Sequence, residues 1–162
     1  MIPFQLAMIP LYREIRALGL MNSLTGMILI YSGVLISFPI FFYSGFIKSI
    51  PLDLEEAGRI DGCGRFGLFA RIVFPLLRPA TATVAILSLL TIWNEFALSF
   101  LFLQQSSKMT LVAALFSFRG QYYTNWPHMF AGVLIAALPI VVAFLAVQKY
   151  FISGITEGAL KG

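Results

Sequence analysis

Residues 56–79 read EAGRIDGCGRFGLFARIVFPLLRP and form a charged, glycine-containing segment between two long apolar runs. Just before this segment, Pro51 suits the first turn of a helix, where a missing amide donor costs nothing. The acidic side chains that follow Pro51 lie near the positive N-terminal end of that helix, where negative charge is favourable. We therefore expect a helix from Pro51 to Ile60, which Gly62 and Gly64 end.

A second short helix is expected after these glycines, because apolar side chains recur there at helical spacing. Phe66, Phe69 and Val73 would form an apolar face that lies on the protein or at the membrane surface. The segment as a whole predicts two short helices joined by a glycine turn.

The first expected helix combines charge with very small side chains. Arg59 follows Glu55 by four residues and Glu56 by three, so it can pair with either carboxylate. Ala57 and Gly58 leave a patch with almost no side chain, where the backbone of another protein could come close.

The composition indicates an integral membrane protein. Of 162 residues, 59% are hydrophobic and 11% are charged, and the mean hydropathy of +0.89 exceeds that of soluble domains. The formal charge of +4 does not indicate nucleic-acid binding, because the basic residues are not gathered in a polar patch. Cys63 is the single cysteine, so neither an internal disulfide nor a metal-ligand set is expected.

Long runs of low charge predict the transmembrane helices. They are Leu24–Ile47, Ala80–Leu103 with Glu95 as its one charge, and Met129–Val147. Pro39 is expected to kink the first run. As a helix, Met1–Tyr12 would span only about 18 Å of a hydrocarbon core of about 30 Å, so we interpret it as the end of a membrane helix whose beginning is missing.

The predicted fold is therefore an all-α integral membrane protein with three full transmembrane helices plus a partial one, in a single domain of residues 1–162. Arg13, Glu14 and Arg16 are expected to form a short polar turn with Gly19 and Asn22. The short polar tail from Gln148 to Gly162 contains three glycines and is expected to be flexible.

The spacing of five residues in the charged segment resembles the EAA loop of bacterial ABC importer permeases, the cytoplasmic element that docks into the ATPase subunit. These residues are Glu56, Ala57, Gly62, Ile72 and Pro75. The sequence departs from that loop at Gly58, where a second alanine is usual, and at Phe74, where leucine is common. Both departures keep the size class or the apolar character.

Other stretches resemble the MalG-type permease subunits of bacterial carbohydrate ABC importers, in the order of that family. They are Ile9–Tyr12, Gly19–Leu20, Pro51, Trp93–Phe96, Gln148–Lys149 and Gly158–Gly162. Because the family normally has six spans, the resemblance implies an N-terminally truncated permease that lacks the first two spans and the start of the third.

The resemblance also implies partners and a location. Residues 48–79 would form a cytoplasmic helix-turn-helix coupling loop at the bacterial inner membrane. Its ATPase-coupling residues would be Glu56, Ala57, Gly58, Asp61, Gly62, Ile72 and Pro75. The implied partners are a second permease subunit, an ABC ATPase dimer and an extracytoplasmic sugar-binding protein, in addition to membrane lipid. The chain has no glycine-rich phosphate loop, so ATP would be bound by the partner ATPase and no cofactor of its own is expected.

Glu95 is a candidate residue of the transport pathway, because an ionisable side chain within a span usually faces a cavity or a partner. It follows Asn94 and Trp93, and the Trp93 ring could stack on a sugar. Alternatively, Glu95 lies near the outer headgroups and Trp93 belongs to the interfacial aromatic belt.

The polar stretch from Gln104 to His128 is rich in aromatic residues that either contact a binding protein or form an interfacial belt. His128 has no neighbouring metal ligand or catalytic partner in the sequence, so it is interpreted as an interface residue. The membrane runs also lack the paired carboxylates or activated nucleophiles of an intramembrane enzyme. Besides a sugar permease, the sequence leaves open a permease for another solute such as glycerol phosphate, and a membrane scaffold that binds an ATPase without transport.

The distribution of lysine and arginine predicts the orientation, because cytoplasmic loops are enriched in them. Seven lie on the side of the charged segment, namely Lys48, Arg59, Arg65, Arg71, Arg78, Lys149 and Lys161. Four lie on the other side, namely Arg13, Arg16, Lys108 and Arg119. The charged segment and the C-terminus are therefore expected in the cytoplasm.

This orientation predicts the sidedness of cysteine labelling. In a background without Cys63, Gly64→Cys should react with an impermeant reagent only from the cytoplasm, and Gln105→Cys only from outside. The measurement is thiol labelling of sealed vesicles of both orientations, and the reverse pattern would contradict the assignment.

Overall fold

The structure, a computed structural model, describes residues 3–120 and 123–159. Its contacts divide the chain into two compact units, one of residues 1–34 and 91–140 and the other of residues 35–90 and 141–162. The elements within the described residues are helical, apart from an isolated antiparallel bridge between Arg119 and Thr124. The prediction of an all-α protein is therefore confirmed.

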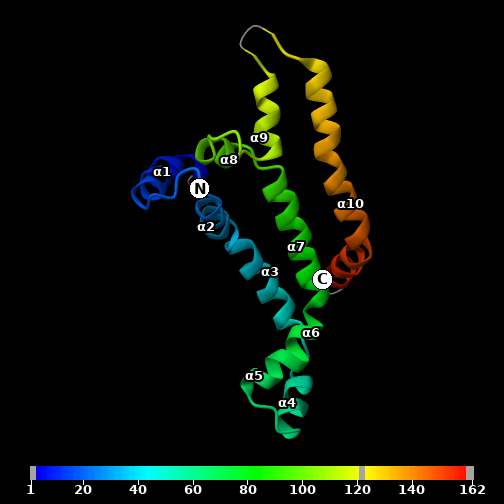
Figure 1. Cartoon of the computed structure of the whole chain (residues 1–162). Helices are drawn as coiled ribbons and strands as arrows, with labels where there is room; N and C mark the ends of the chain where they lie inside the picture. Colours follow the sequence, from blue (N-terminus) through cyan, green and yellow to red (C-terminus); the bar gives the residue numbers. More distant parts are fainter. Residues whose placement is uncertain (1–2, 121–122, 160–162) are drawn as a thin grey trace. The chain divides into compact units, whose positions relative to one another are not determined.

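The first unit consists mainly of short helices (Figure 1). Residues from several of them form one apolar cluster. The elements of this unit are η1 (Phe4–Ala7), α1 (Met8–Ala17), α2 (Leu24–Leu35), α8 (Ala97–Phe102), α9 (Leu111–Leu115), η3 (Phe116–Phe118) and the first part of α10 (Trp126–Ala159). The buried cluster consists of Ile15, Met27, Ile30, Leu98, Phe102 and Leu103. It joins α1 and α2 to α8, which lies some 70 residues later in the sequence.

Hydrogen bonds of Asn22 connect the turn between α1 and α2 to the end of α8 and the loop after it. The Asn22 side-chain oxygen accepts hydrogen bonds from the amides of Gln104 at 2.6 Å and Gln105 at 3.1 Å. Its own amide donates to the carbonyl of Phe102, and its carbonyl accepts from the Lys108 ammonium group at 2.7 Å. Asn22 has a positive φ of 53°, a conformation that asparagine adopts more readily than most residues.

The predicted polar turn is wrong for Arg13, Glu14 and Arg16, which belong to α1, and confirmed for Gly19 and Asn22, which lie in the turn after it. The three charged side chains of α1 are exposed while Ile15 is buried in the cluster, so α1 is amphipathic and continues through them. The turn comes later and ends at Ser23, whose hydroxyl accepts the amide of Gly26 and caps α2.

The second unit contains α3 and the charged segment. Its elements are α3 (Ser37–Lys48), α4 (Leu52–Ile60), α5 (Arg65–Leu68), the π-helical turn η2 (Phe69–Val73), α6 (Phe74–Leu76), most of α7 (Arg78–Trp93) and the end of α10. The Tyr43 hydroxyl donates to the Thr81 hydroxyl at 3.0 Å and connects α3 to α7.

The first predicted run, Leu24–Ile47, is helical but interrupted at Ile36. Pro39 explains the position of the break, because a proline ring clashes with the carbonyl four residues earlier and that carbonyl belongs to Leu35, the last residue of α2. The expected disruption by Pro39 is confirmed.

The second predicted run, Ala80–Leu103, is not one helix, so that prediction is wrong. α7 ends at Trp93 and α8 begins only at Ala97. With 16 residues, α7 is about 24 Å long, shorter than a hydrocarbon core of about 30 Å. At its other end, α7 meets the helical segment Arg65–Leu76 at a bend of 67°.

The third run is confirmed as a helix. In α10 the stretch Trp126–Ala146 is long and apolar enough to cross a membrane, and only 6% of its most apolar window is buried by protein. Among the described residues it is the one such helix, and up to three spans result if each interrupted helix pair counts as one. The number of spans therefore stays a prediction, whereas the exposed apolar surface of α10 fits contact with lipid.

The prediction of a flexible tail is wrong for Gly154 and Gly158, because α10 continues through both to Ala159. Gly162 lies outside the described residues. Pro139 is accommodated inside the same helix.

Candidate functional site

The charged segment folds into a helical hairpin of residues 52–76, in which α4 and the helical stretch from α5 to α6 lie side by side (Figure 1). The helix predicted for Pro51–Ile60 is confirmed, with Pro51 just before its first residue. Asp53 and Glu55 lie in its first turn and Arg59 in its last, as the helix dipole favours. Arg59 pairs with Glu55 at 3.7 Å, one of the two pairings expected.

Gly62 provides the turn of this hairpin through its left-handed backbone, with a φ of 81°. The amide of Cys63 bonds to the carbonyl of Gly58, and the amide of Gly62 bonds to that of Arg59, both at 3.0 Å. This is the Schellman arrangement that ends many helices, and glycine is the residue that adopts its required angle without strain. The predicted turn at Gly62 is confirmed.

Gly58 is the point of closest approach inside the hairpin. It is buried, and a Cβ atom at this position would collide with Cδ1 of Ile72 and touch Cδ1 of Leu68 at 3.4 Å. The prediction of a bare patch that faces another protein is therefore wrong for Gly58, whereas Ala57 is exposed. Because Gly58 has no side chain, Leu68 and Ile72 of the second helix of the hairpin can pack directly against α4.

The three residues of the predicted apolar face on the second helix differ in their exposure. Val73 is buried, but the Phe66 side chain is 84% exposed and Phe69 is about half exposed. Leu68 and Ile72 instead meet α4 at Gly58. The predicted set was drawn with a regular helical period, whereas the π-helical turn Phe69–Val73 shifts the register in the middle of this helix.

Pro75 explains the π-helical turn. Proline has no amide hydrogen, so the carbonyl of Arg71 has no donor four residues later. The amide of Phe74 bonds to the carbonyl of Phe69, five residues earlier, which widens the turn just before the proline. Ile72 and Pro75 thus shape the inside of the hairpin.

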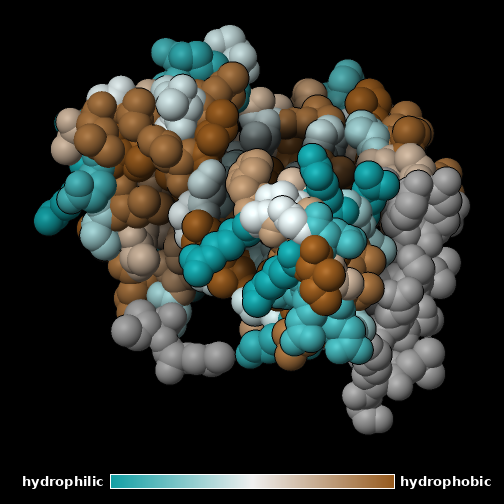
Figure 2. Space-filling view, turned by 90° about the horizontal axis from the view of Figure 1, so that it is seen from below, coloured by the Kyte–Doolittle hydropathy of each residue, from teal (hydrophilic) through white to brown (hydrophobic). Residues whose placement is uncertain are grey.

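The outer surface of the hairpin mixes charge with exposed apolar side chains, as Figure 2 shows from the end of the molecule where α4 and α5 lie. Glu56 and Asp61 are exposed. Ile60 is 86% and Phe66 84% exposed, on either side of the turn. Phe66 was expected only as part of an apolar helix face and Ile60 only as the end of a helix, although the glycines at positions 62, 64 and 67 have no side chains that could cover a large neighbour.

Glu95 lies at the break between α7 and α8 and bonds within its own unit. One carboxylate oxygen accepts the amide of Leu98 at 2.6 Å. The other accepts the amide of Ser99 at 3.0 Å and the hydroxyl of Tyr31 on α2 at 2.9 Å. The carboxylate therefore satisfies the first amides of α8 and ties that helix to α2.

Trp93 likewise has a partner in the structure. Its indole N–H donates to the carbonyl of Ala136 in α10 at 3.1 Å. The neighbouring carbonyl of Ile135 has no helical donor, because Pro139, four residues later, lacks an amide hydrogen. Asn94 is exposed in the break. Trp93 and Glu95 thus bond to different elements, and a role of the three adjacent residues in the transport pathway stays a prediction.

The aromatic stretch before α10 forms stacked pairs. Trp126 stacks on Phe130, and His128 stacks on Phe118 with ring centroids 5.9 Å apart in both pairs. Nδ1 of His128 lies 2.7 Å from the side-chain oxygen of Asn125. Tyr122 lies outside the described residues. Within the part of the chain that the structure describes, no three His, Cys, Asp or Glu side chains gather into a metal site.

Comparison with known proteins assigns the family. Residues 1–157 match the family described as "Binding-protein-dependent transport system inner membrane component". The chain belongs to this family. The resemblance to bacterial importer permeases is thereby confirmed, and the chain that contains the hairpin is a membrane component of a transport system.

Individual proteins that are similar in sequence to this chain support the same family assignment. The chain is 45% identical over 162 residues to the melibiose/raffinose/stachyose import permease protein MelC of Bacillus subtilis, covering 99% of this chain and 59% of MelC. It is 39% identical to a probable starch degradation products transport system permease protein, AmyC, of Thermoanaerobacterium thermosulfurigenes, covering 99% of this chain and 58% of AmyC. The chain thus spans somewhat more than half the length of these relatives.

A solved structure supports the fold. A chain of a bacterial ABC transporter involved in the import of the acidic polysaccharide alginate superimposes with a TM-score of 0.72 over 88% of this chain and 55% of that chain, at 24% identity. This likeness shows that the two chains share a fold over the superimposed part.

The contact at Gly58 predicts that a larger side chain opens the hairpin. Gly58→Leu should force α4 away from Leu68 and Ile72 at a cost of about 1–3 kcal/mol, the usual range for overpacking. Tryptic cleavage after Arg65 should then accelerate roughly five- to 150-fold, because it follows the population of the open form. Ala57→Leu, on the exposed side of the same helix, is the size-matched control, and Ile72→Ala should restore Gly58→Leu. Equal cleavage rates for Gly58→Leu and the original chain would contradict the packing role.

The hydrogen bonds of Glu95 predict a loss of stability without it. Glu95→Ala leaves the amides of Leu98 and Ser99 without their acceptor, at a cost of about 1–3 kcal/mol for each that stays unpaired. Tyr31→Phe removes one donor and should cost about 0.5–1.5 kcal/mol. The two effects should be less than additive, because both act on one carboxylate. Denaturation in mixed micelles measures this, and unchanged stability of Glu95→Ala would show that the carboxylate serves another purpose.

Proposed function

We propose that the chain is part of a permease subunit of an ATP-driven sugar importer, which forms half of the translocation pathway and couples to a separate ATPase by alternating access. Membership of the binding-protein-dependent transport family is the observation that carries this proposal. In this proposal a second permease subunit completes the pathway, a cytoplasmic ATPase dimer binds ATP, and an extracytoplasmic binding protein delivers the sugar. The hairpin and the C-terminus lie in the cytoplasm of a bacterial cell.

The hairpin is proposed as the surface that docks into the ATPase. Its interior contacts at Gly58 and its Schellman turn at Gly62 support a rigid body that can transmit force. Its outer surface offers Glu56 and Asp61 for charge pairing, and exposed Ile60 and Phe66 as apolar anchors of the kind that dominate interfaces. Gly58, Ile72 and Pro75 contribute by holding this surface in shape.

Carbohydrate is the proposed solute class, because MelC and AmyC are both described as transporting sugars or products of starch. These two relatives carry different sugars at similar identity, so the class and not the individual sugar is proposed. A permease for another solute, such as glycerol phosphate, and a scaffold without transport are the alternatives that the following experiment separates.

Removal of the outer anchors should uncouple transport. In a permease of full family length that carries this sequence, Phe66→Ala should weaken ATPase binding by at least about 2 kcal/mol, roughly thirtyfold. Glu56→Lys should act in the same direction by reversing a docking charge. Arg65→Ala, which neighbours Phe66, is the control expected to be mild. The measurements are ATPase co-purification and uptake of a panel of sugars and glycerol phosphate from the same membranes.

Each outcome has a distinct reading. Loss of both ATPase and uptake in Phe66→Ala and Glu56→Lys supports coupling through the hairpin. ATPase binding without uptake of any solute by the intact assembly supports the scaffold, and uptake of glycerol phosphate alone supports the other solute class. Wild-type levels of both in both variants would show that the hairpin is only a connector.

A further inference from the structure

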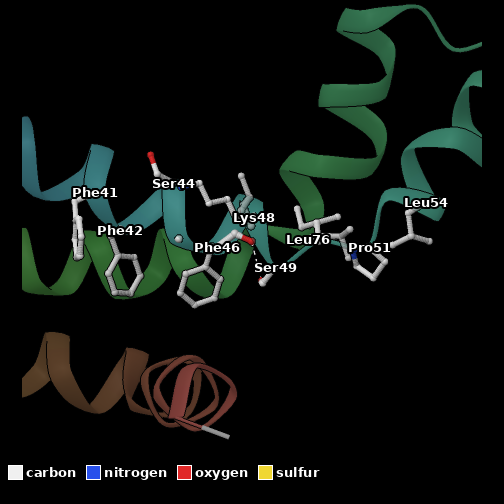
Figure 3. Close-up of a pocket in the computed structure, with 12 residues that line it drawn as sticks. Phe41, Phe42, Ser44, Phe46, Lys48, Ser49, Pro51, Leu54 and Leu76 are labelled. Atoms are coloured by element: carbon white, nitrogen blue, oxygen red, sulfur yellow. Dashed lines mark hydrogen bonds between the residues drawn. The ribbon is translucent and has the colours of Figure 1, made fainter. Parts of the chain in front are cut away.

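A pocket of about 690 Å³ lies beside α3 in the second unit, at the point where the apolar run gives way to the charged segment. Its walls come from the C-terminal half of α3, from the start of α4 and from α6 with the residue after it. Figure 3 shows the rings of Phe42 and Phe46 on one side of α3, with Pro51 and Leu54 at the far end. The volume falls within the roughly 300–1,000 Å³ of sites for small molecules.

Most of the residues that line the pocket are apolar, and Lys48 is the one cation among them. Phe41, Phe42 and Phe46 belong to the run without charged residues, whereas Lys48 is the first charged residue after it. Among the described residues no carboxylate pairs with Lys48, and Glu55 on the neighbouring helix is engaged by Arg59. A lysine at such a boundary can keep its stem on apolar surface and its ammonium group at headgroup depth.

We propose that this pocket binds one anionic phospholipid, with an acyl chain against the phenylalanine rings and the headgroup phosphate at Lys48. The apolar walls match the chain, and the unpaired cation matches the phosphate. The proposal rests on the membership of the chain in a family of inner-membrane components, not on the proposed transport of sugar.

The dimensions favour a lipid over a transmembrane helix from a partner protein. Along α3 the pocket extends from Phe41 to Ser49, which is about 12 Å at the rise of an α-helix. Pro51 and Leu54 then close its end. A membrane-spanning helix that packed against α3 would need a groove along much of the roughly 30 Å hydrocarbon core. A lipid chain with its headgroup needs only a short cleft that ends at the interface.

Gly45 offers a way to fill the pocket without disturbing the protein. It lines the pocket, and among the described residues a Cβ atom built on it would have no atom within 4 Å beyond its chain neighbours and the backbone of its own helix. Gly45→Leu should therefore occupy lipid space, and it replaces glycine by a better helix former. Gly33 on α2 has the same open surroundings but does not line the pocket, so Gly33→Leu is a matched control.

The test is native mass spectrometry of the purified chain in detergent, titrated with phosphatidylglycerol or with phosphatidylcholine. The chain should retain one phosphatidylglycerol in preference to phosphatidylcholine. Gly45→Leu should weaken that binding at least tenfold, and Gly33→Leu should leave it unchanged. Lys48→Gln should weaken phosphatidylglycerol binding about fivefold, the effect of one basic side chain near a lipid surface, with phosphatidylcholine unaffected. Inorganic phosphate at equal concentration should not displace the lipid.

Equal retention of the two lipids, or unchanged binding in Gly45→Leu, would overturn the proposal. So would displacement of the lipid by inorganic phosphate, which would assign the site to a free anion. A photoreactive group attached through Gly45→Cys in a Cys63→Ala background should cross-link to lipid in membranes. Capture of a polypeptide instead would assign the pocket to an interface between subunits and would also overturn the proposal.

Discussion

Every break in a helix within an apolar chain leaves backbone amides and carbonyls that lipid cannot satisfy, and this constraint determines much of the structure. The protein answers it with side chains at the breaks themselves. Glu95 accepts the first amides of α8, and Ser23 caps α2. Asn22, in the turn after α1, forms hydrogen bonds with the backbone of Phe102 and Gln104 at the end of α8 and in the loop after it. Ser23, Asn22 and Glu95 therefore lie where the backbone needs hydrogen-bond partners.

Glycines show how position decides the role of one residue type. Gly58 and Gly45 both lie in helices, yet a Cβ atom would collide with Ile72 at the first and meet empty space at the second. The first glycine permits packing within the hairpin, whereas the second leaves a pocket open. Gly62 has neither role, because its positive φ makes the turn. The spacing of residues in the sequence predicts only the role of Gly62, because the ends of helices have a recognisable sequence pattern. The contacts that decide the roles of Gly58 and Gly45 have no such pattern.

The sequence predicted the elements better than their breaks. Charge and glycine placement were sufficient to predict α4, its end at Gly62 and the long apolar helix before Ala146, because these depend on local preferences. From hydropathy alone, α7 and α8 were predicted as one span that contains a single charge, Glu95. The break between the two helices depends on hydrogen bonds from Tyr31 and Ser99 to the Glu95 carboxylate, and a hydropathy pattern contains no information about these contacts. The π-helical turn Phe69–Val73 before Pro75 likewise could not be predicted from a regular helical period, and it changes the register between Phe66 and the buried Val73.

The residues that resemble the EAA loop divide into two physical groups. Gly58, Gly62, Ile72 and Pro75 set the internal geometry of the hairpin, while Glu56, Ala57 and Asp61 lie on its surface. A match to this spacing is therefore largely a statement about how the hairpin folds. The largest exposed apolar side chains, Ile60 and Phe66, are not part of the spacing. Because the internal group is constrained by packing and the two exposed side chains are not, Ile60 and Phe66 can change without loss of the hairpin, and in the proposed docking they are the positions where selectivity for one ATPase over another can arise.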